Sequence, residues 1–107
     1  MFVEHIGNGL DLSGTAKSIS AIFETSLEPG QEIHPHYHED LEEIYYILLG
    51  VGQITIENEQ NEVLRGDVIY IPPLALHSLH NISNIPLRFV TVTAGISSER
   101  KTYNAQI

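Results

Sequence analysis

Short runs of β-branched and aromatic residues recur along this chain, and breaks rich in Gly, Pro and Asn separate them. This pattern is typical of many short strands, and no segment has the apolar repeat of an amphipathic helix. Without helices to cover a parallel sheet, the chain is expected to form an antiparallel sandwich or barrel. The predicted strands are residues 18–27, 32–38, 43–49, 52–57, 67–71, 76–82 and 87–93. The polar segment 58–62 is predicted to be a break between strands, with a hairpin tip at 58–61.

The length of 107 residues suits one domain built around one core. A chain of this size buries roughly 60–70% of its unfolded surface when it folds. We expect a single domain over residues 1–107, with its core at about 16–95. Residues 1–15 are expected to form an arm or an additional strand, and residues 96–107 a polar tail.

The chain carries 14 acidic and 5 basic side chains, which give a formal net charge of −9. Such a surface repels nucleic acid and anionic lipid, so neither is an expected partner. No apolar run approaches the ~20 residues of a transmembrane helix, and no signal-peptide pattern opens the chain. The absence of cysteine excludes disulfides, thiolate ligands and cysteine nucleophiles. A cytoplasmic protein is therefore expected.

Three histidines stand at two-residue spacing, and a carboxylate and a distant fourth histidine follow them: His34, His36, His38, Glu43 and His77. Alternate side chains of a strand share a face, with Cα atoms about 6.6 Å apart, so His36 and His38 can hold one ion between them. Imidazole nitrogens and a carboxylate oxygen suit Mn, Fe, Co, Ni, Cu or Zn. Four such ligands on an octahedral ion leave two positions for water, substrate or dioxygen.

The spacing of these residues matches two family motifs. The first, G-x5-H-x-H-x4-E-x6-G, and the second, G-x5-P-x-G-x2-H-x3-N, are met by Gly30, His36, His38, Glu43, Gly50, Gly66, Pro72, His77 and Asn81. Leu74 stands where the second motif has its second glycine. On these motifs the chain resembles a small single-domain cupin, and the strand pattern extends the resemblance to most of the chain.

The resemblance implies an all-β double-stranded β-helix, or jelly-roll barrel, with one divalent transition metal ion inside it near an open mouth. Carried over residue by residue, the metal ligands are His36, His38, Glu43 and His77. Cupins of this size are commonly homodimers joined through sheet contacts, which cover exposed edges. A homodimer that binds a small molecule is therefore the expected assembly.

Strand parity extends the site beyond its ligands. His34 shares the inward parity of His36 but lies about 13 Å along the strand from His38, too far to bind the same ion. It is expected to be a structural or pocket-wall residue, with a substrate-contacting or catalytic, proton-shuttling role as the alternative. The predicted substrate pocket comprises Tyr45, Ile47, Leu79 and Arg88. Arg88 would hold a substrate carboxylate or phosphate if it faced inward, with an exposed salt bridge as the alternative.

No glycine-rich phosphate cradle and no serine nucleophile motif are present, so any chemistry would depend on the metal. The leading expectation is a metal-dependent enzyme acting on a small polar, oxygen-rich metabolite, as an isomerase or epimerase or as a dioxygenase. The resemblance also admits decarboxylases and other lyases. Isomerisation also needs a general base, which His34 or a tyrosine would supply. The alternatives are a non-catalytic binding or sensory cupin and a structural barrel with an adventitious ion. The fold and the ligand set do not choose among these.

Overall fold

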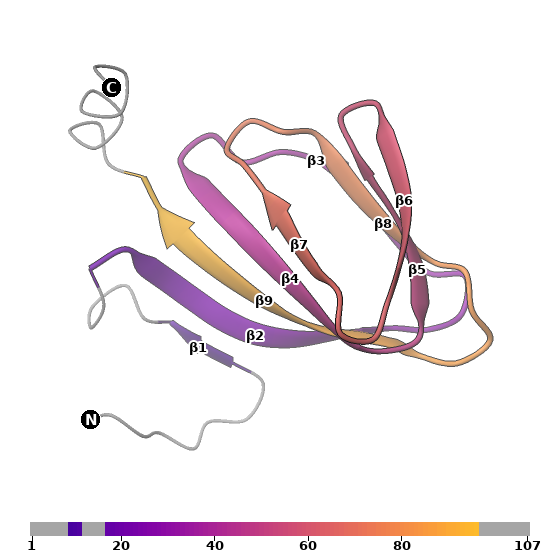
Figure 1. The fold of residues 1–107 in the computed structure, drawn as a ribbon. Coiled ribbons are helices and arrows are strands. Elements are labelled where there is room, and N and C mark those ends of the chain that lie inside the picture. Colours follow the sequence, from indigo (N-terminus) through magenta and orange to yellow (C-terminus); the bar gives the residue numbers. More distant parts are fainter. Residues whose placement is uncertain (1–8, 12–16, 97–107) are drawn as a thin grey trace.

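The computed structural model describes residues 9–11 and 17–96, and these residues form nine strands and no helix (Figure 1). The strands are β1 (Gly9–Asp11), β2 (Ile19–Leu27), β3 (Glu32–His36), β4 (Leu41–Leu49), β5 (Val51–Ile56), β6 (Glu59–Leu64), β7 (Val68–Ile71), β8 (His77–Asn81) and β9 (Leu87–Gly95). The all-β prediction is confirmed. Of the segment 1–15, only Gly9–Asp11 is described, and it forms a strand. The expected polar tail lies outside the described residues, apart from residue 96. No helix long enough and apolar enough to cross a membrane is found in the described residues.

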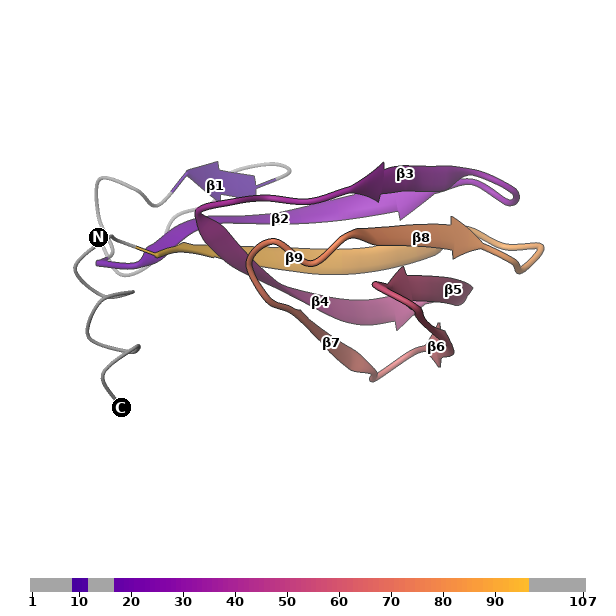
Figure 2. The ribbon, with the colours of Figure 1, turned by 90° about the horizontal axis from the view of Figure 1, so that it is seen from above.

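The strands form two sheets with the orders β1-β2-β9-β4-β7 and β3-β8-β5-β6. Neighbouring strands pair antiparallel throughout both sheets. Figures 1 and 2 show the sheets facing each other across a common interior. This arrangement is the expected jelly-roll barrel.

Alternation along the long strands fills the barrel. Over residues 43–47 of β4 and 87–93 of β9 every second side chain is buried, including Tyr45, Ile47, Leu87 and Phe89. The apolar core consists of Leu27, Tyr45, Ile47, Ile54, Val63, Ile69, Ile71, Ala75, Leu79, Leu87 and Phe89. The buried polar side chains are Glu43, His77, Asn81, Thr91 and Thr93. Since apolar burial drives the folding of such a domain, these few polar groups each require a reason to be inside.

The predicted break at 58–62 is wrong. Glu59–Leu64 forms β6, which pairs with β5 in register from Ile56↔Glu59 to Val51↔Leu64. The hairpin exists, but its tip is the two-residue turn Glu57–Asn58, with Glu57 in the left-handed region at φ 55°. Because β6 lies at the edge of its sheet and buries only Val63, it lacks the alternating apolar residues that signal a strand.

The turn between β4 and β5 requires glycine. Gly50 has φ +88°, and a Cβ added there would lie 2.5 Å from the carbonyl oxygen of Pro86. A side chain would therefore clash with the backbone that leads into β9. Gly50, the last glycine of the first motif, is thus required by the close approach of two turns.

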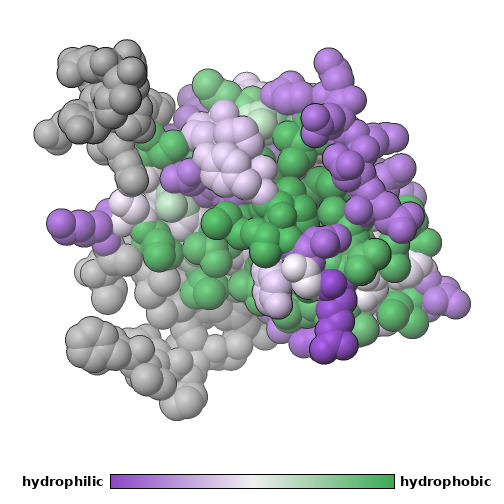
Figure 3. Space-filling model, viewed as in Figure 1, coloured by the Kyte–Doolittle hydropathy of each residue, from purple (hydrophilic) through white to green (hydrophobic). Residues whose placement is uncertain are grey.

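The outer surface of the five-stranded sheet carries a row of apolar side chains. Ile22, Val92, Ile44 and Tyr70 lie side by side across β2, β9, β4 and β7. Ile22, Ile44 and Tyr70 are exposed. In Figure 3 apolar side chains gather over β4 and β7, whereas hydrophilic ones cover β6. We call the surface formed by Ile22, Val92, Ile44 and Tyr70 the outer apolar face.

Candidate metal centre

The four expected ligands come together at one end of the barrel. His36 ends β3, His38 lies in the connection to β4, Glu43 is in β4, and His77 begins β8. One ligand atom from each of these residues lies within 4.8 Å of the others. Residues that are 41 positions apart in sequence, His36 and His77, are direct partners across the β3–β8 ladder. The constellation predicted from spacing therefore exists as a cluster.

A bulge in β3 decides which histidines face inward. Strand β3 pairs with β8 at Ile33↔Leu79 and again at His36↔His77, so three steps on β3 match two on β8. Pro35 lies in this interval, and proline, which has no N–H to donate, is typically found at bulges or edges of sheets. The extra residue lets Ile33 and His36 both line the interior although they are three positions apart.

The same bulge turns His34 outward. Its side chain is 83% exposed, and its Nδ1 lies 3.2 Å from Glu32 on the surface. The prediction that His34 lies on the pocket wall, where it could contact a substrate or shuttle a proton, is wrong, because strict alternation does not hold across Pro35. The prediction that it is not a ligand of the same ion agrees with this position.

Backbone carbonyls orient two of the imidazoles. Nδ1 of His77 lies 2.9 Å from the carbonyl oxygen of Ala75, and Nδ1 of His36 lies 2.8 Å from that of His34. A carbonyl only accepts hydrogen bonds, so each Nδ1 carries the proton and each Nε2 keeps its lone pair when the ring is neutral. This outer hydrogen bond is the usual device that fixes a metal-binding histidine. Both rings are prepared to bind through Nε2.

The arrangement leaves two buried acceptors facing each other. Oε1 of Glu43 lies 3.2 Å from Nε2 of His77 and 3.5 Å from Nε2 of His38. Neither Oε1 of Glu43 nor Nε2 of His77 has a hydrogen-bond partner among the described residues. Such a buried pair is costly unless a cation or a proton lies between its atoms. Burial lowers the pKa of His77. Glu43 and the Ala75 carbonyl together raise it by a larger amount, so the net shift of the pKa is upward. The three nitrogens and one carboxylate oxygen therefore fit a divalent transition metal ion.

Hydrogen bonding between loops supports His38. The amide of Leu74 donates to the carbonyl oxygen of His38 at 2.7 Å, which ties the β7–β8 connection to the β3–β4 connection. Leu74 has φ +69°, the left-handed conformation that glycine adopts without strain. The turn expected of the motif's second glycine is thus formed by a leucine, at a cost of about 1–2 kcal/mol.

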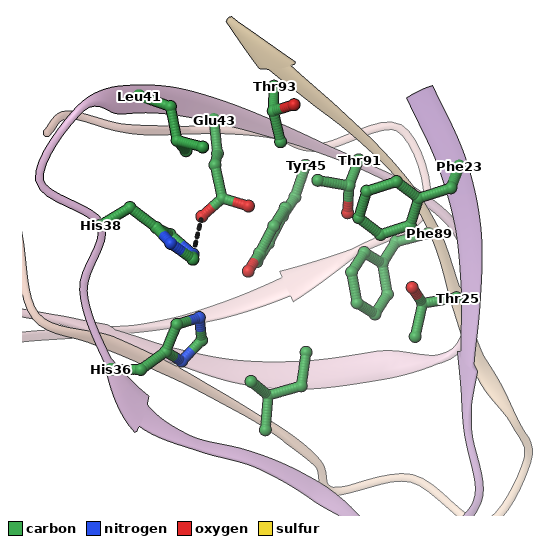
Figure 4. Close-up of a pocket in the computed structure, with 11 residues that line it drawn as sticks. Phe23, Thr25, His36, His38, Leu41, Glu43, Tyr45, Phe89, Thr91 and Thr93 are labelled. Carbon is green, nitrogen blue, oxygen red and sulfur yellow. Dashed lines mark ion pairs between the residues drawn. The ribbon is translucent and has the colours of Figure 1, made fainter. Parts of the chain in front are cut away.

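An open pocket of about 250 Å³ lies at the centre and includes three of the four ligands in its wall. It is lined by Phe23, Thr25, Ile33, His36, His38, Leu41, Glu43, Tyr45, Phe89, Thr91 and Thr93. In Figure 4, His36 and His38 lie on one side of the pocket, and Phe23, Phe89 and Thr91 lie on the other. Tyr45 was expected here, and its pKa is raised by burial and by Glu43, so its hydroxyl keeps its proton.

Three other predicted pocket residues lie elsewhere. Ile47 and Leu79 face inward as expected, but they belong to the packed core and do not line the pocket. Arg88 lies on the outer surface of β9, where its Nε donates to Glu24 at 2.7 Å. Its predicted role in the substrate pocket is wrong because β9 turns Leu87 and Phe89 inward and Arg88 outward. The alternative, an exposed salt bridge, is correct.

Sequence reasoning missed most of the pocket wall. Thr91 and Thr93 alternate along β9 with Val90 and Val92, and this parity was a usable signal. Ile33 was hidden by the bulge at Pro35, since parity counted from His36 places it outside. Asn81 serves the fold: its side-chain amide donates to the carbonyl oxygens of Leu27 and Ile85.

The fold and the cluster define a small jelly-roll barrel with a three-histidine, one-carboxylate centre. The chain belongs to the cupin family, since the family described as Cupin domain matches residues 23–93, a segment that contains all four candidate ligands.

Relatives with known names or structures are similar to this chain over that same region. An uncharacterized protein of Methanocaldococcus jannaschii is 44% identical over 70 residues, 65% of this chain and 56% of that protein. An oxalate-binding protein of Thermotoga maritima is 38% identical over 66 residues, 62% of this chain and 54% of that protein. The chain thus spans about half the length of these relatives. A crystal structure from Thermotoga maritima, described as a predicted oxalate decarboxylase, superposes with a TM-score of 0.76 at 30% identity, covering 81% of this chain and 76% of that one.

Proposed function

We propose that this chain is a metal-dependent cupin that holds one divalent transition metal ion on His36, His38, Glu43 and His77 and acts on a small oxygen-rich metabolite. The proposal rests on one observation: Oε1 of Glu43 and Nε2 of His77 are buried against each other, and neither atom has a hydrogen-bond partner among the described residues. A purely structural barrel would gain stability by replacing these two groups with apolar ones. Their retention beside a pocket supports a binding role.

The pocket suits a small ligand whose negative charge is balanced by the metal ion. When bound, such an ion polarises a ligand's oxygen or, if redox-active, supports oxygen chemistry. Phe23, Leu41 and Phe89 line the pocket with apolar surface that excludes water from the ligand. Among the described residues no lysine or arginine lines it. The side chains of the described residues thus offer no separate cationic clamp for a carboxylate or phosphate.

The composition of the pocket wall disfavours one of the expected reaction types, isomerisation or epimerisation. Isomerisation or epimerisation needs a base that takes a proton from the ligand. Among the residues that the structure describes, the titratable side chains that line the pocket are His36, His38, Glu43 and Tyr45. The first three are assigned to the ion, and Tyr45 keeps its proton. We therefore favour oxygenation or decarboxylation, which depend less on a separate base, over isomerisation.

Non-catalytic binding is the second candidate. The relative named as an oxalate-binding protein, 38% identical over the matched segment, favours it. The same absence of a free base among the described pocket residues is equally suited to a protein that only holds its ligand.

Measuring both product formation and thermal stabilisation by the same compounds distinguishes an enzyme from a non-catalytic binding protein. Metal-loaded protein is incubated with small carboxylates, including oxalate, under air and under nitrogen, and products are followed by mass spectrometry. An enzyme of the proposed kind consumes a substrate with metal present, and His77→Ala abolishes that consumption. Thermal stabilisation by the same compounds without any product would support the binding candidate and overturn the enzymatic one.

A further inference from the structure

Two hydroxyl groups on the pocket wall form no hydrogen bond within the described part of the chain. Tyr45 and Thr91 are direct partners across the β4–β9 ladder, and both line the pocket. Neither hydroxyl forms a hydrogen bond with any residue that the structure describes, whereas the neighbouring Thr93 hydroxyl lies 2.6 Å from that of Ser20. In Figure 4 the Tyr45 hydroxyl points into the space between the histidines and the aromatic wall. Two unpaired hydroxyls beside a pocket are available to a ligand's oxygens.

Aromatic surface lies next to these hydroxyls. Phe23 is the cross-strand partner of Thr91 on β2, and Phe89 is two residues before Thr91 on β9. The rings of Tyr45 and Phe89 lie 5.0 Å apart, centre to centre. The far side of the pocket thus offers apolar ring surface with a hydroxyl pair at its border, which suits an uncharged hydrocarbon segment.

The site can balance the negative charge of only one ligand carboxylate. A divalent ion together with Glu43 leaves one net positive charge, which balances a single carboxylate. The cations that the structure describes, Lys17, Arg65 and Arg88, do not line the pocket. A second carboxylate in the ligand would therefore be buried beside rings without a counter-charge, inside a protein whose formal net charge is −9.

The volume of the pocket suits a small ligand. At about 250 Å³ it is smaller than the roughly 300–1,000 Å³ typical of sites for drug-sized molecules, so it fits a small metabolite. From these observations we infer that the ligand is a small 2-oxo or 2-hydroxy monocarboxylic acid. Its oxygenated end binds at the metal, Tyr45 and Thr91 donate to its oxygens, and its apolar tail lies against Phe23 and Phe89. This inference rests on the proposed metal centre.

Two acids with the same chelating end test it. 2-Oxopentanoate and 2-oxoglutarate have equal carbon chains, and only the second has a carboxylate on its tail. Calorimetry on metal-loaded protein is expected to show at least about tenfold tighter binding of 2-oxopentanoate, because an unpaired buried carboxylate is costly. Thr25→Arg, which places a cation on the pocket wall, is expected to narrow or reverse this preference. Equal or tighter binding of 2-oxoglutarate by the wild-type protein, or no binding of either acid, would overturn the ligand class.

The hydroxyl pair is tested separately. Tyr45→Phe is expected to weaken binding of 2-oxopentanoate about two- to tenfold, the usual range for one neutral hydrogen bond, with the metal content unchanged. Tyr46→Phe, on the outer surface of the same strand, is the matched control and leaves binding unchanged. Unaltered affinity in Tyr45→Phe would refute the assigned contact. Wild-type protein that binds no metal would instead refute the proposed function itself, so the two failures are distinguishable.

Discussion

The substitution Glu43→Gln gives a change of stability whose sign depends on pH and on metal. The Glu43 side chain is 7% exposed, and its Oε1 lies 3.2 Å from Nε2 of His77 without a hydrogen bond. A glutamine of the same shape carries no charge, and its amide can donate to that nitrogen. Without metal and at a pH above the raised pKa of His77, the imidazole is neutral, and the substitution should relieve a buried contact that lacks a hydrogen bond, worth about 1–3 kcal/mol. The metal-free variant is therefore expected to be more stable than the metal-free wild type.

Lower pH reverses the difference. The pKa of His77 in the folded protein is raised above its ordinary value of 6.5, so the proton on His77 stabilises the wild-type fold at pH values below about 6.5. This contribution is lost as the pH rises through the raised pKa. At pH 5.5 Glu43→Gln removes the partner of a protonated imidazole and should destabilise the protein, by up to the 3–5 kcal/mol typical of a broken buried pair.

Metal restores the advantage of the wild type. An ion present at about 1,000 times its dissociation constant adds about 4 kcal/mol to the stability of a protein that binds it only when folded. Glu43→Gln lacks the only carboxylate of the centre and should gain much less. For a domain of this size, 1 kcal/mol corresponds to a shift of roughly 4–8 °C in Tm.

Differential scanning calorimetry or urea unfolding, with chelator and with added metal at pH 5.5 and at a pH above the raised pKa of His77, measures all of these differences. One result would refute the reasoning. If metal-free Glu43→Gln is several kcal/mol less stable than wild type at the higher pH as well, Glu43 is a satisfied partner of a protonated His77 over the whole range. The buried contact would then give no support for a metal.

Three further predictions concern the scaffold. His34→Ala and Arg88→Gln should each change stability by less than about 1 kcal/mol and leave metal content unchanged, because both side chains lie on the surface; loss of metal in either variant, measured by elemental analysis, would contradict their placement. Gly50→Ala should cost about 3 kcal/mol or more by urea unfolding, because its Cβ would lie 2.5 Å from the Pro86 carbonyl oxygen, whereas Gly30→Ala, with open space around its Cβ, should cost only about 1–2 kcal/mol. We also expect two copies to associate through the outer apolar face, so sedimentation should give a dimer for wild type and a monomer for Val92→Asp; a wild-type monomer would exclude this assembly.

Much of the fold could be predicted from the sequence because runs of β-branched and aromatic residues are separated by Gly, Pro and Asn breaks. Strands β4 and β9 contain such runs, residues 44–49 and 87–92, although only every second residue is buried and both faces carry apolar side chains. Strand β6 could not be predicted in the same way, since it is a polar edge strand with Val63 as its one buried residue. Its pairing depends on β5 and on the two-residue turn, and neither leaves an apolar pattern in β6 itself.

The ligand set was also predictable, whereas its surroundings were not. Motif spacing identified His36, His38, Glu43 and His77, and the structure places their ligand atoms within 4.8 Å of one another. Parity failed at His34 because Pro35 introduces a bulge, a feature that the presence of proline in a predicted strand should have suggested. Parity could not predict which inward-facing side chains line the pocket and which pack in the core. Parity places both Tyr45 and Ile47 inside, but only packing between the two sheets decides that Tyr45 reaches the pocket and Ile47 the core.

The metal content of protein purified without a histidine tag tests the central claim most directly. Elemental analysis of wild type and of His77→Ala, after loading with a divalent transition metal and dialysis, gives the ratio of metal to chain. The proposed centre predicts about one equivalent for the wild type and a ratio near zero for the variant. A wild type that retains no metal, or a variant that retains a full equivalent, would contradict the centre and the function proposed for it.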